Sequence, residues 1–148
     1  MNDDFNIINS SKYLFLTDIY EPFENCLQLE VTIPYVSDEV KTIINNIDFG
    51  QLGEIKYNEI SPRYKIIFDN YISYSVINES YDIGESDKFL FEGRLFKVFQ
   101  ESDFLEYLSC VTYATPLNNY HLKHYQLVTL NHIVNIASIN QPLIEKIN

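Results

Sequence analysis

The side chains best suited to acid–base or metal chemistry in this 148-residue chain are three histidines and two cysteines. His121 and His124 lie three residues apart, and His132 follows in the next apolar run. Residues three apart on a strand point to opposite faces of the sheet, and no neighbouring carboxylate or cysteine completes a ligand set with this pair. We therefore expect no metal site, and we expect His132 to be a hydrogen-bonded, half-buried residue of the scaffold.

Cys110 could act as a nucleophile if a histidine activated it. It falls on the apolar side of a predicted helix, near its end, where cysteines are usually inert core residues. Cys26 and Cys110 match no C-x-x-C or zinc spacing. We expect two reduced, buried thiols, and a single long-range disulfide is the alternative.

Paired acidic residues can carry out glycoside hydrolysis, and four of them follow the longest strand pattern: Glu79, Asp82, Glu85 and Asp87. Their crowding into one loop favours a solvated turn over two carboxylates that flank a substrate. With only 4 glycines, the chain also lacks a glycine-rich phosphate-binding loop. The sequence thus predicts no catalytic residue and no cofactor, and a protein that is not an enzyme.

Alternation of apolar and polar residues predicts strands along most of the chain. The longest pattern runs from Tyr64 to Tyr81, with a turn at Asp69-Asn70. We expect it to form a hairpin at the centre of an antiparallel sheet, which delivers an acidic loop to the surface. Shorter strand patterns cover 13–16, 26–33, 54–60, 90–100, 121–130 and 133–138.

Two segments have helical spacing. In residues 38–47, apolar side chains at i, i+3, i+4 and i+7 would share one face, with Ser37 as N-cap and Gly50 as the stop. Residues 103–111 form the second predicted helix, and residues 1–10 look poorly anchored. The expected fold is α+β: one domain spanning 1–148, with a strongly twisted or barrel-like antiparallel sheet of about six to eight strands and two short helices packed on it.

Negative charge limits the partners that this chain can bind. The formal net charge is -11, and residues 1–60 carry eleven acidic residues against three lysines. Binding to nucleic acid or to an anionic membrane requires basic clusters, which the chain lacks. The first residues lack a signal-peptide pattern, and no apolar run approaches the length of a membrane span. We expect a cytoplasmic protein whose acidic surface either keeps it soluble or attracts a basic partner.

Three segments of the C-terminal half resemble a family of small bacterial proteins: FDNYISYSVINESYD at 68–82, GRLFKVFQESDFLEYLSCVTYA at 93–114 and LKHYQLVTLNHIVNIAS at 122–138. In size, acidity and expected fold, proteins of this family are similar to the immunity proteins of bacterial toxin systems. The resemblance implies a protein that binds and neutralises a cognate protein toxin, for example a basic nuclease.

The predicted function is therefore that of an immunity-type protein with an acidic, Tyr-containing binding surface. An alternative is a small ligand-binding or enzymatic barrel with a pocket lined by Tyr and His, and a third is a self-associating structural subunit. The oligomeric state stays open. The residues predicted to contact the partner are Asp38, Glu39, Glu79, Tyr81, Asp82, Glu85 and Asp87.

Overall fold

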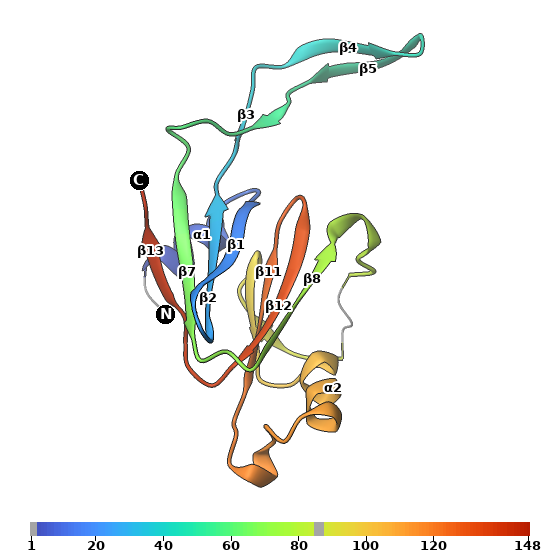
Figure 1. The fold of residues 1–148 in the computed structure, drawn as a ribbon. Helices are drawn as coiled ribbons and strands as arrows, with labels where there is room; N and C mark the ends of the chain where they lie inside the picture. Colours follow the sequence, from blue (N-terminus) through green and yellow to red (C-terminus); the bar gives the residue numbers. More distant parts are fainter. Residues whose placement is uncertain (1–2, 85–87) are drawn as a thin grey trace.

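Two antiparallel sheets pack face to face and form the body of the protein (Figure 1). The computed structural model describes residues 3–84 and 88–148. In that part of the chain, one sheet has four strands, in the spatial order β1 (Phe15–Phe23), β2 (Cys26–Thr32), β7 (Arg63–Asp69) and β13 (Leu143–Lys146). The other has five, in the order β8 (Ser73–Asn78), β12 (His132–Ser138), β11 (Lys123–Val128), β10 (Phe96–Phe99) and β9 (Phe91–Glu92). The α+β class is confirmed, but both sheets are open, so the barrel-like closure is not.

Aromatic rings from both sheets fill the space between them. Phe68 of β7 lies with its ring centroid 5.2 Å from Tyr125 of β11 and 6.5 Å from Phe96 of β10. Burial raises the pKa of Tyr125 to about 12. The predicted alternation is confirmed in β7, where Tyr64, Ile66 and Phe68 are all buried.

Two α-helices and two short 3-10 turns complete the body: α1 (Asp3–Ser10), α2 (Asp103–Val111), η1 (Glu79–Tyr81) and η2 (Pro116–Asn118). The helix predicted at 103–111 is confirmed, and its N-cap is Ser102, whose side chain accepts a hydrogen bond from the backbone N–H of Leu105. Residues 1–10 were expected to be poorly anchored, but from Asp3 onward they are held in place, because Phe5 and Ile8 of α1 are buried in the core.

The helix predicted over 38–47 is wrong, because this segment is extended. Between β2 and β7 the chain forms an arm with four strands, β3 (Tyr35–Val36), β4 (Val40–Ile44), β5 (Ile47–Leu52) and β6 (Ile55–Lys56). Asn45 and Asn46 both have positive φ, 48° and 63°, which is the geometry of a tight hairpin turn. The β-branched residues on either side favour strands over a helix, and this preference outweighs the helical spacing.

The predicted hairpin over 64–81 is also different in the structure. Both of its strands form, and Asn70 turns the chain with a φ of 52°. However, β7 belongs to the four-stranded sheet and β8 to the other, so the turn connects the two layers. β8 is consequently an edge strand, and the pair of strands predicted on either side of Asn131 forms the true hairpin, β11–β12.

Asn9 ties α1 to the second sheet. Its Oδ1 accepts hydrogen bonds from the backbone N–H groups of Arg94, Leu95 and Phe96, at 2.7, 3.0 and 2.9 Å. Gly93 permits this approach: its φ is 89°, and a Cβ there would lie 2.1 Å from the carbonyl oxygen of Phe96. One amide oxygen therefore satisfies three backbone donors.

Substitution Asn9→Ala is expected to lower the free energy of unfolding by about 2–3 kcal/mol, because the three donors lose their shared acceptor. Urea denaturation measures the change. Asn6→Ala, at an exposed position of the same helix, is the control and should change the free energy of unfolding by less than about 0.5 kcal/mol. Equal effects of the two substitutions would contradict this role of Asn9.

Candidate protein-binding surface

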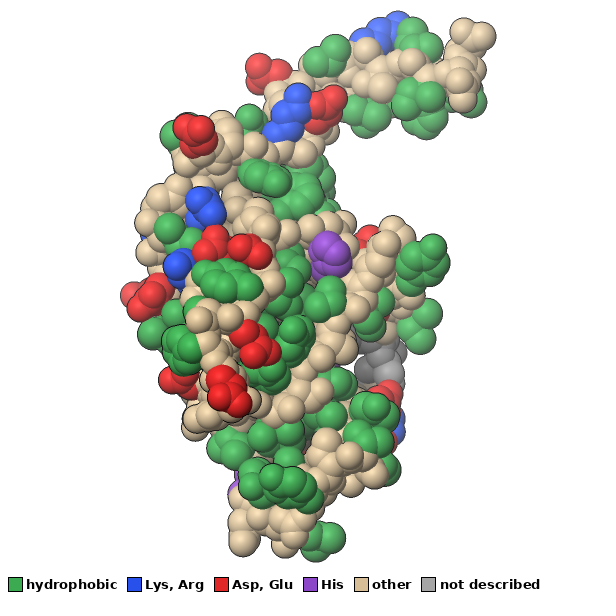
Figure 2. All heavy atoms as spheres, in the orientation of Figure 1, with side chains coloured by type: hydrophobic (Ala, Val, Ile, Leu, Met, Phe, Trp, Pro, Cys, Tyr) green, Lys and Arg blue, Asp and Glu red, His purple; other side chains and the backbone are tan. Residues whose placement is uncertain are grey.

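The arm formed by residues 34–60 projects from the body and is the most exposed apolar structure of the described chain (Figure 1). Strands β4 and β5 form a two-stranded sheet, hydrogen-bonded to no other strand within residues 3–84 and 88–148. Figure 2 shows apolar side chains along the arm, with open space between its outer part and the body. A two-stranded hairpin without cover is at best marginally stable in water, so the arm is an element that another surface would stabilise.

Ten apolar side chains of the arm are between 45% and 87% exposed. They are Tyr35, Val36, Val40, Ile43, Ile44, Ile47, Phe49, Leu52, Tyr57 and Ile60. Single exposed apolar residues are normal on a protein surface, but a contiguous group of this size indicates an interaction site. Isoleucines such as Ile43 are about three-fifths exposed, so covering one completely would contribute about 1–2 kcal/mol to binding.

Local interactions fix the tip of the arm. Ile44 pairs with Ile47 across the turn, and the register shifts between Lys41 and Ile43, so one residue bulges out. The Oδ1 of Asp48 accepts a hydrogen bond of 2.8 Å from the backbone N–H of Gly50, which has a φ of 76°. These features twist a short hairpin that has no packing partner on either face.

The root of the arm is joined to the body by close contacts. The rings of Tyr57 and Phe15 lie 5.1 Å apart. Within the arm, the backbone N–H of Ser37 donates a hydrogen bond of 2.8 Å to the carbonyl oxygen of Glu54. The Ser37 hydroxyl accepts one of 2.9 Å from the backbone N–H of Glu54. Gly53 is required beside them, because a Cβ there would lie 2.6 Å from the carbonyl oxygen of Ser37. A pocket of about 510 Å³ at the root is lined in part by Tyr35 and Ile60, so it continues the apolar surface of the arm.

Negative charge borders this apolar surface. Both lysines of the arm are paired, Lys41 with Asp48 at 3.4 Å and Lys56 with Glu54. The remaining carboxylates of the arm, Asp38, Glu39 and Glu59, form no ion pair with another described residue. An apolar strip with acidic residues on its margin is complementary to a protein with basic residues around an apolar patch.

The structure separates the residues that were predicted to bind a partner. Asp38 and Glu39 are exposed in the arm, between β3 and β4. Glu79 and Tyr81 lie in η1, Asp82 follows, and all three are exposed. No hydrogen bond or ring contact in the described chain joins the two groups. Glu85 and Asp87 lie outside the described residues.

The sequence did not predict this exposed apolar surface: Val40, Ile43, Ile44 and Ile47 were expected on the buried face of a helix, and residues 54–60 were expected to form a short strand. A signal was present: a run rich in β-branched residues, VKTII, precedes Asn45-Asn46, and Ile47 and Phe49 follow at alternate positions, which is typical of a hairpin. No pattern in the sequence, however, indicates that such a hairpin stays uncovered.

His124 is the centre of a second candidate site, which the sequence analysis considered only for metal binding. Its Nε2 lies 2.9 Å from Oδ1 of Asn135, which also accepts a hydrogen bond of 3.0 Å from Gln126. Because this oxygen only accepts, Nε2 carries the proton, and Nδ1 accepts from the hydroxyl of Ser102 at 3.0 Å. The His124 ring stacks on Phe99, with the centroids 4.9 Å apart.

A serine that bonds to a histidine held by an amide can be the nucleophile of a hydrolase. Here Ser102 is only 5% exposed, and its oxygen is also engaged as the N-cap of α2. The adjoining pocket, of about 190 Å³, is smaller than the sites that usually hold small molecules. Burial lowers the pKa of His124 to about 4, so the ring is neutral at pH 7. We interpret this network as the structural link between α2 and strands β11 and β12.

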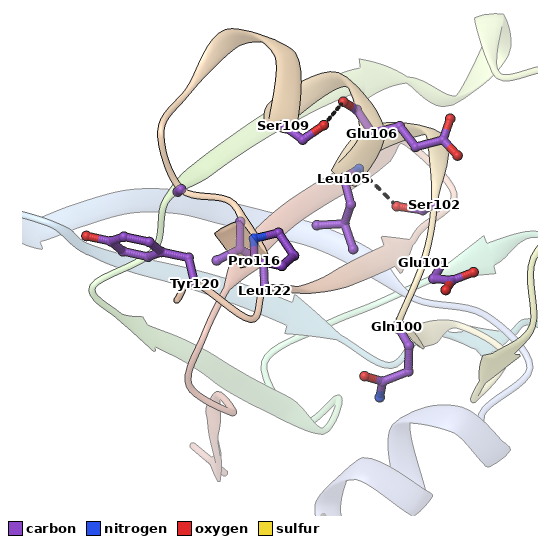
Figure 3. Close-up of a pocket in the computed structure, with 10 residues that line it drawn as sticks. Gln100, Glu101, Ser102, Leu105, Glu106, Ser109, Pro116, Tyr120 and Leu122 are labelled. Atoms are coloured by element: carbon purple, nitrogen blue, oxygen red, sulfur yellow. Dashed lines mark hydrogen bonds between the residues drawn. The ribbon is translucent and has the colours of Figure 1, made fainter. Parts of the chain in front are cut away.

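A larger pocket, of about 420 Å³, lies between α2 and the segment that follows it (Figure 3). Leu105 extends toward Pro116 and Leu122, while the carboxylate of Glu106 points away from them. Lys88 binds that carboxylate at 3.4 Å. The acidic residues that line the pocket, Glu101 and Glu106, are both exposed, so the pocket holds no buried acid for acid–base chemistry.

The two cysteines differ in burial. Cys26 is buried, and burial, with a contribution from Asp69, raises the pKa of its thiol. Cys110 is exposed on α2, so the expectation of two buried thiols is wrong for this residue; both cysteines are free. The described residues contain no group of three or more His, Cys, Asp or Glu side chains that could hold a metal ion.

Comparison with family models, with curated proteins and with solved structures found no match for this chain. No helix within residues 3–84 and 88–148 has both the length and the apolar character needed to cross a membrane.

Proposed function

We propose that this chain acts by binding another protein through its arm, and that it is a cytoplasmic immunity-type protein that neutralises a basic protein toxin. The observation that carries the proposal is the arm, whose ten exposed apolar side chains have no cover in the described chain. The net charge of -11 favours a partner with a basic surface, because opposite charges attract. The immunity role itself rests on the family resemblance of the C-terminal half.

A ligand-binding barrel is less consistent with this architecture. The two sheets are open, and the rings of Phe68, Phe96 and Tyr125 occupy the space between them. A small-molecule site of the barrel kind would instead need an internal cavity with converging polar groups. The pockets described above all lie at the surface, beside α2 or at the root of the arm.

The test is to co-express the chain with a basic protein toxin, which is sought first among the genes beside its own. Cells that the toxin alone kills should grow, and the two purified proteins should elute together at micromolar concentrations. Raising the ionic strength from about 0.05 to about 0.5 M should slow association, because salt screens the attraction between opposite charges. A chain that neither rescues growth nor forms a complex would refute the proposal.

A further inference from the structure

Strand β8 ends the five-stranded sheet, and no strand within residues 3–84 and 88–148 pairs with its outer edge. In an antiparallel strand, every second residue directs its backbone N–H and C=O to the same neighbour. The N–H of Glu79 donates a hydrogen bond to the carbonyl of Asn131, just before β12. Every second residue back from Glu79 along β8 therefore also directs its backbone groups to β12. The backbone groups of Tyr74, Val76 and Asn78 therefore point away from β12, toward the free edge.

In the two sheets of the body, the other three edges carry features that prevent pairing with a further strand. β1 contains Asp18, Glu21 and Pro22, and its register shifts twice. β13 has four residues and ends in Glu145 and Lys146, and β9 has only two residues.

β8 has none of these features. Its sequence, SYSVIN, contains no charge and no proline, and its pairing with β12 is regular over six residues. Three of its apolar side chains are also exposed: Tyr74, Val76 and Ile77, at 38%, 42% and 38%. A regular, uncharged and exposed edge is a template for an added strand.

The charges around this edge indicate the sign of the partner. Glu21 of β1 is bonded to Tyr71, whose ring lies 5.3 Å from that of Tyr74. Glu79 follows the other end of β8. The segments β1, β8 and η1 contain no lysine or arginine. An extended segment with basic side chains would therefore find complementary charge, whereas a second copy of this chain would bring the same acidic residues against it.

We propose that the free edge of β8 binds an extended, basic segment of the partner protein as an additional strand. The inference rests on the proposed function and deepens it, since it names the element that the partner supplies. The partner's backbone would bond to Tyr74, Val76 and Asn78, while its lysines or arginines would lie near Glu21 and Glu79.

The test uses the peptide acetyl-(Lys-Val)₃-amide as the probe, titrated into the full chain and followed by NMR of the backbone amides. We expect shifts and slower hydrogen exchange at Tyr74, Val76 and Asn78. The (Glu-Val)₃ peptide should bind at least about tenfold more weakly, because of charge repulsion. A lysine peptide that is N-methylated at every residue should also lose about tenfold in affinity, since it cannot donate strand hydrogen bonds from either edge.

Protein variants localise the effect. Val76→Pro removes an edge donor without removing a bond to β12, and should weaken peptide binding at least about fivefold. Val76→Thr keeps the donor and the β-branched shape and is the matched control. If Val76→Pro does not fold, the N-methylated peptide on the unsubstituted chain still decides the question.

The inference would be overturned if the N-methylated peptide bound as tightly as the unmethylated one, or if the NMR shifts mapped away from β8. It would also be overturned if the free protein were already a dimer with its β8 amides protected from exchange. Absence of peptide binding while the arm still captures the toxin would refute the β8 inference alone. A protein that binds the lysine peptide at β8 but does not capture the toxin would refute the proposed function alone.

Discussion

The triple substitution Ile43→Thr, Ile44→Thr and Ile47→Thr is expected to weaken binding of the protein partner at least about a hundredfold. These side chains are 60%, 53% and 58% exposed in the free protein. Because a little more than half of each side chain is exposed, covering it fully would contribute about 1–2 kcal/mol, and a hundredfold loss of affinity corresponds to about 2.7 kcal/mol in total. Threonine keeps the β-branched shape that favours the hairpin. Calorimetric titration with the toxin of the co-expression test measures the change.

The arm packs little against the body, so the same substitutions should alter the free energy of unfolding by less than about 0.5 kcal/mol. Leu90→Thr with Leu117→Thr is the matched control, because both leucines are more than nine-tenths exposed and lie outside the arm. Unchanged toxin affinity in the arm variant, or an equal loss in the control, would show that the arm is not the binding surface.

The free energy of unfolding is expected to fall as the pH is lowered from about 6.5 to about 4. Protonation of His124 in the unfolded chain should account for a large part of this fall. The folded protein holds the pKa of this ring at about 4, while the unfolded chain has a pKa of about 6.5. Between these values the unfolded state binds a proton that the folded state does not. The free energy of unfolding should therefore decrease by about 1.4 kcal/mol per pH unit, to a total of about 3 kcal/mol.

His124→Gln isolates this contribution. The variant loses the stacking on Phe99 and should be less stable at pH 7.5, but its free energy of unfolding should depend less on pH between 6.5 and 4. His121→Gln makes the same change at an exposed histidine of the same segment and should keep the pH dependence of the unsubstituted chain. Denaturant titrations at a series of pH values measure both. A His124→Gln protein with an unaltered slope would contradict the assigned role.

Features of this fold that depend on neighbouring residues could be predicted from the sequence. The helix at 103–111 has its N-cap, Ser102, and its apolar spacing within one short segment, so local interactions decide it. The alternation of Tyr64, Ile66 and Phe68 identifies a strand and its buried face in the same way. The class α+β follows from counting such segments.

Features of the fold that depend on residues distant in the sequence could not be predicted in this way. The spacing of apolar residues in 38–47 fits both a helix and a hairpin. The structure decides between them, because it shows this segment extended and with its apolar side chains exposed. Asn135 and Ser102 lie 11 and 22 residues from His124. The pairing of β11 with β12 brings Asn135 to the ring, and the pairing of β10 with β11 brings Ser102. The four residues of β13 gain their strand identity only from pairing with β7.

The insertion point of the arm has a consequence for how binding could change during evolution. β2 and β7 are adjacent partners, paired from Cys26 with Asp69 to Thr32 with Arg63, so residues 33–62 are in effect one long hairpin loop. A turn of about four residues could connect the same two strands, and shortening the loop from about 30 residues would recover about 2 kcal/mol of closure entropy. The body does not need the arm to complete its sheets. Related chains could therefore exchange this one loop and acquire a new partner while the aromatic core stays the same.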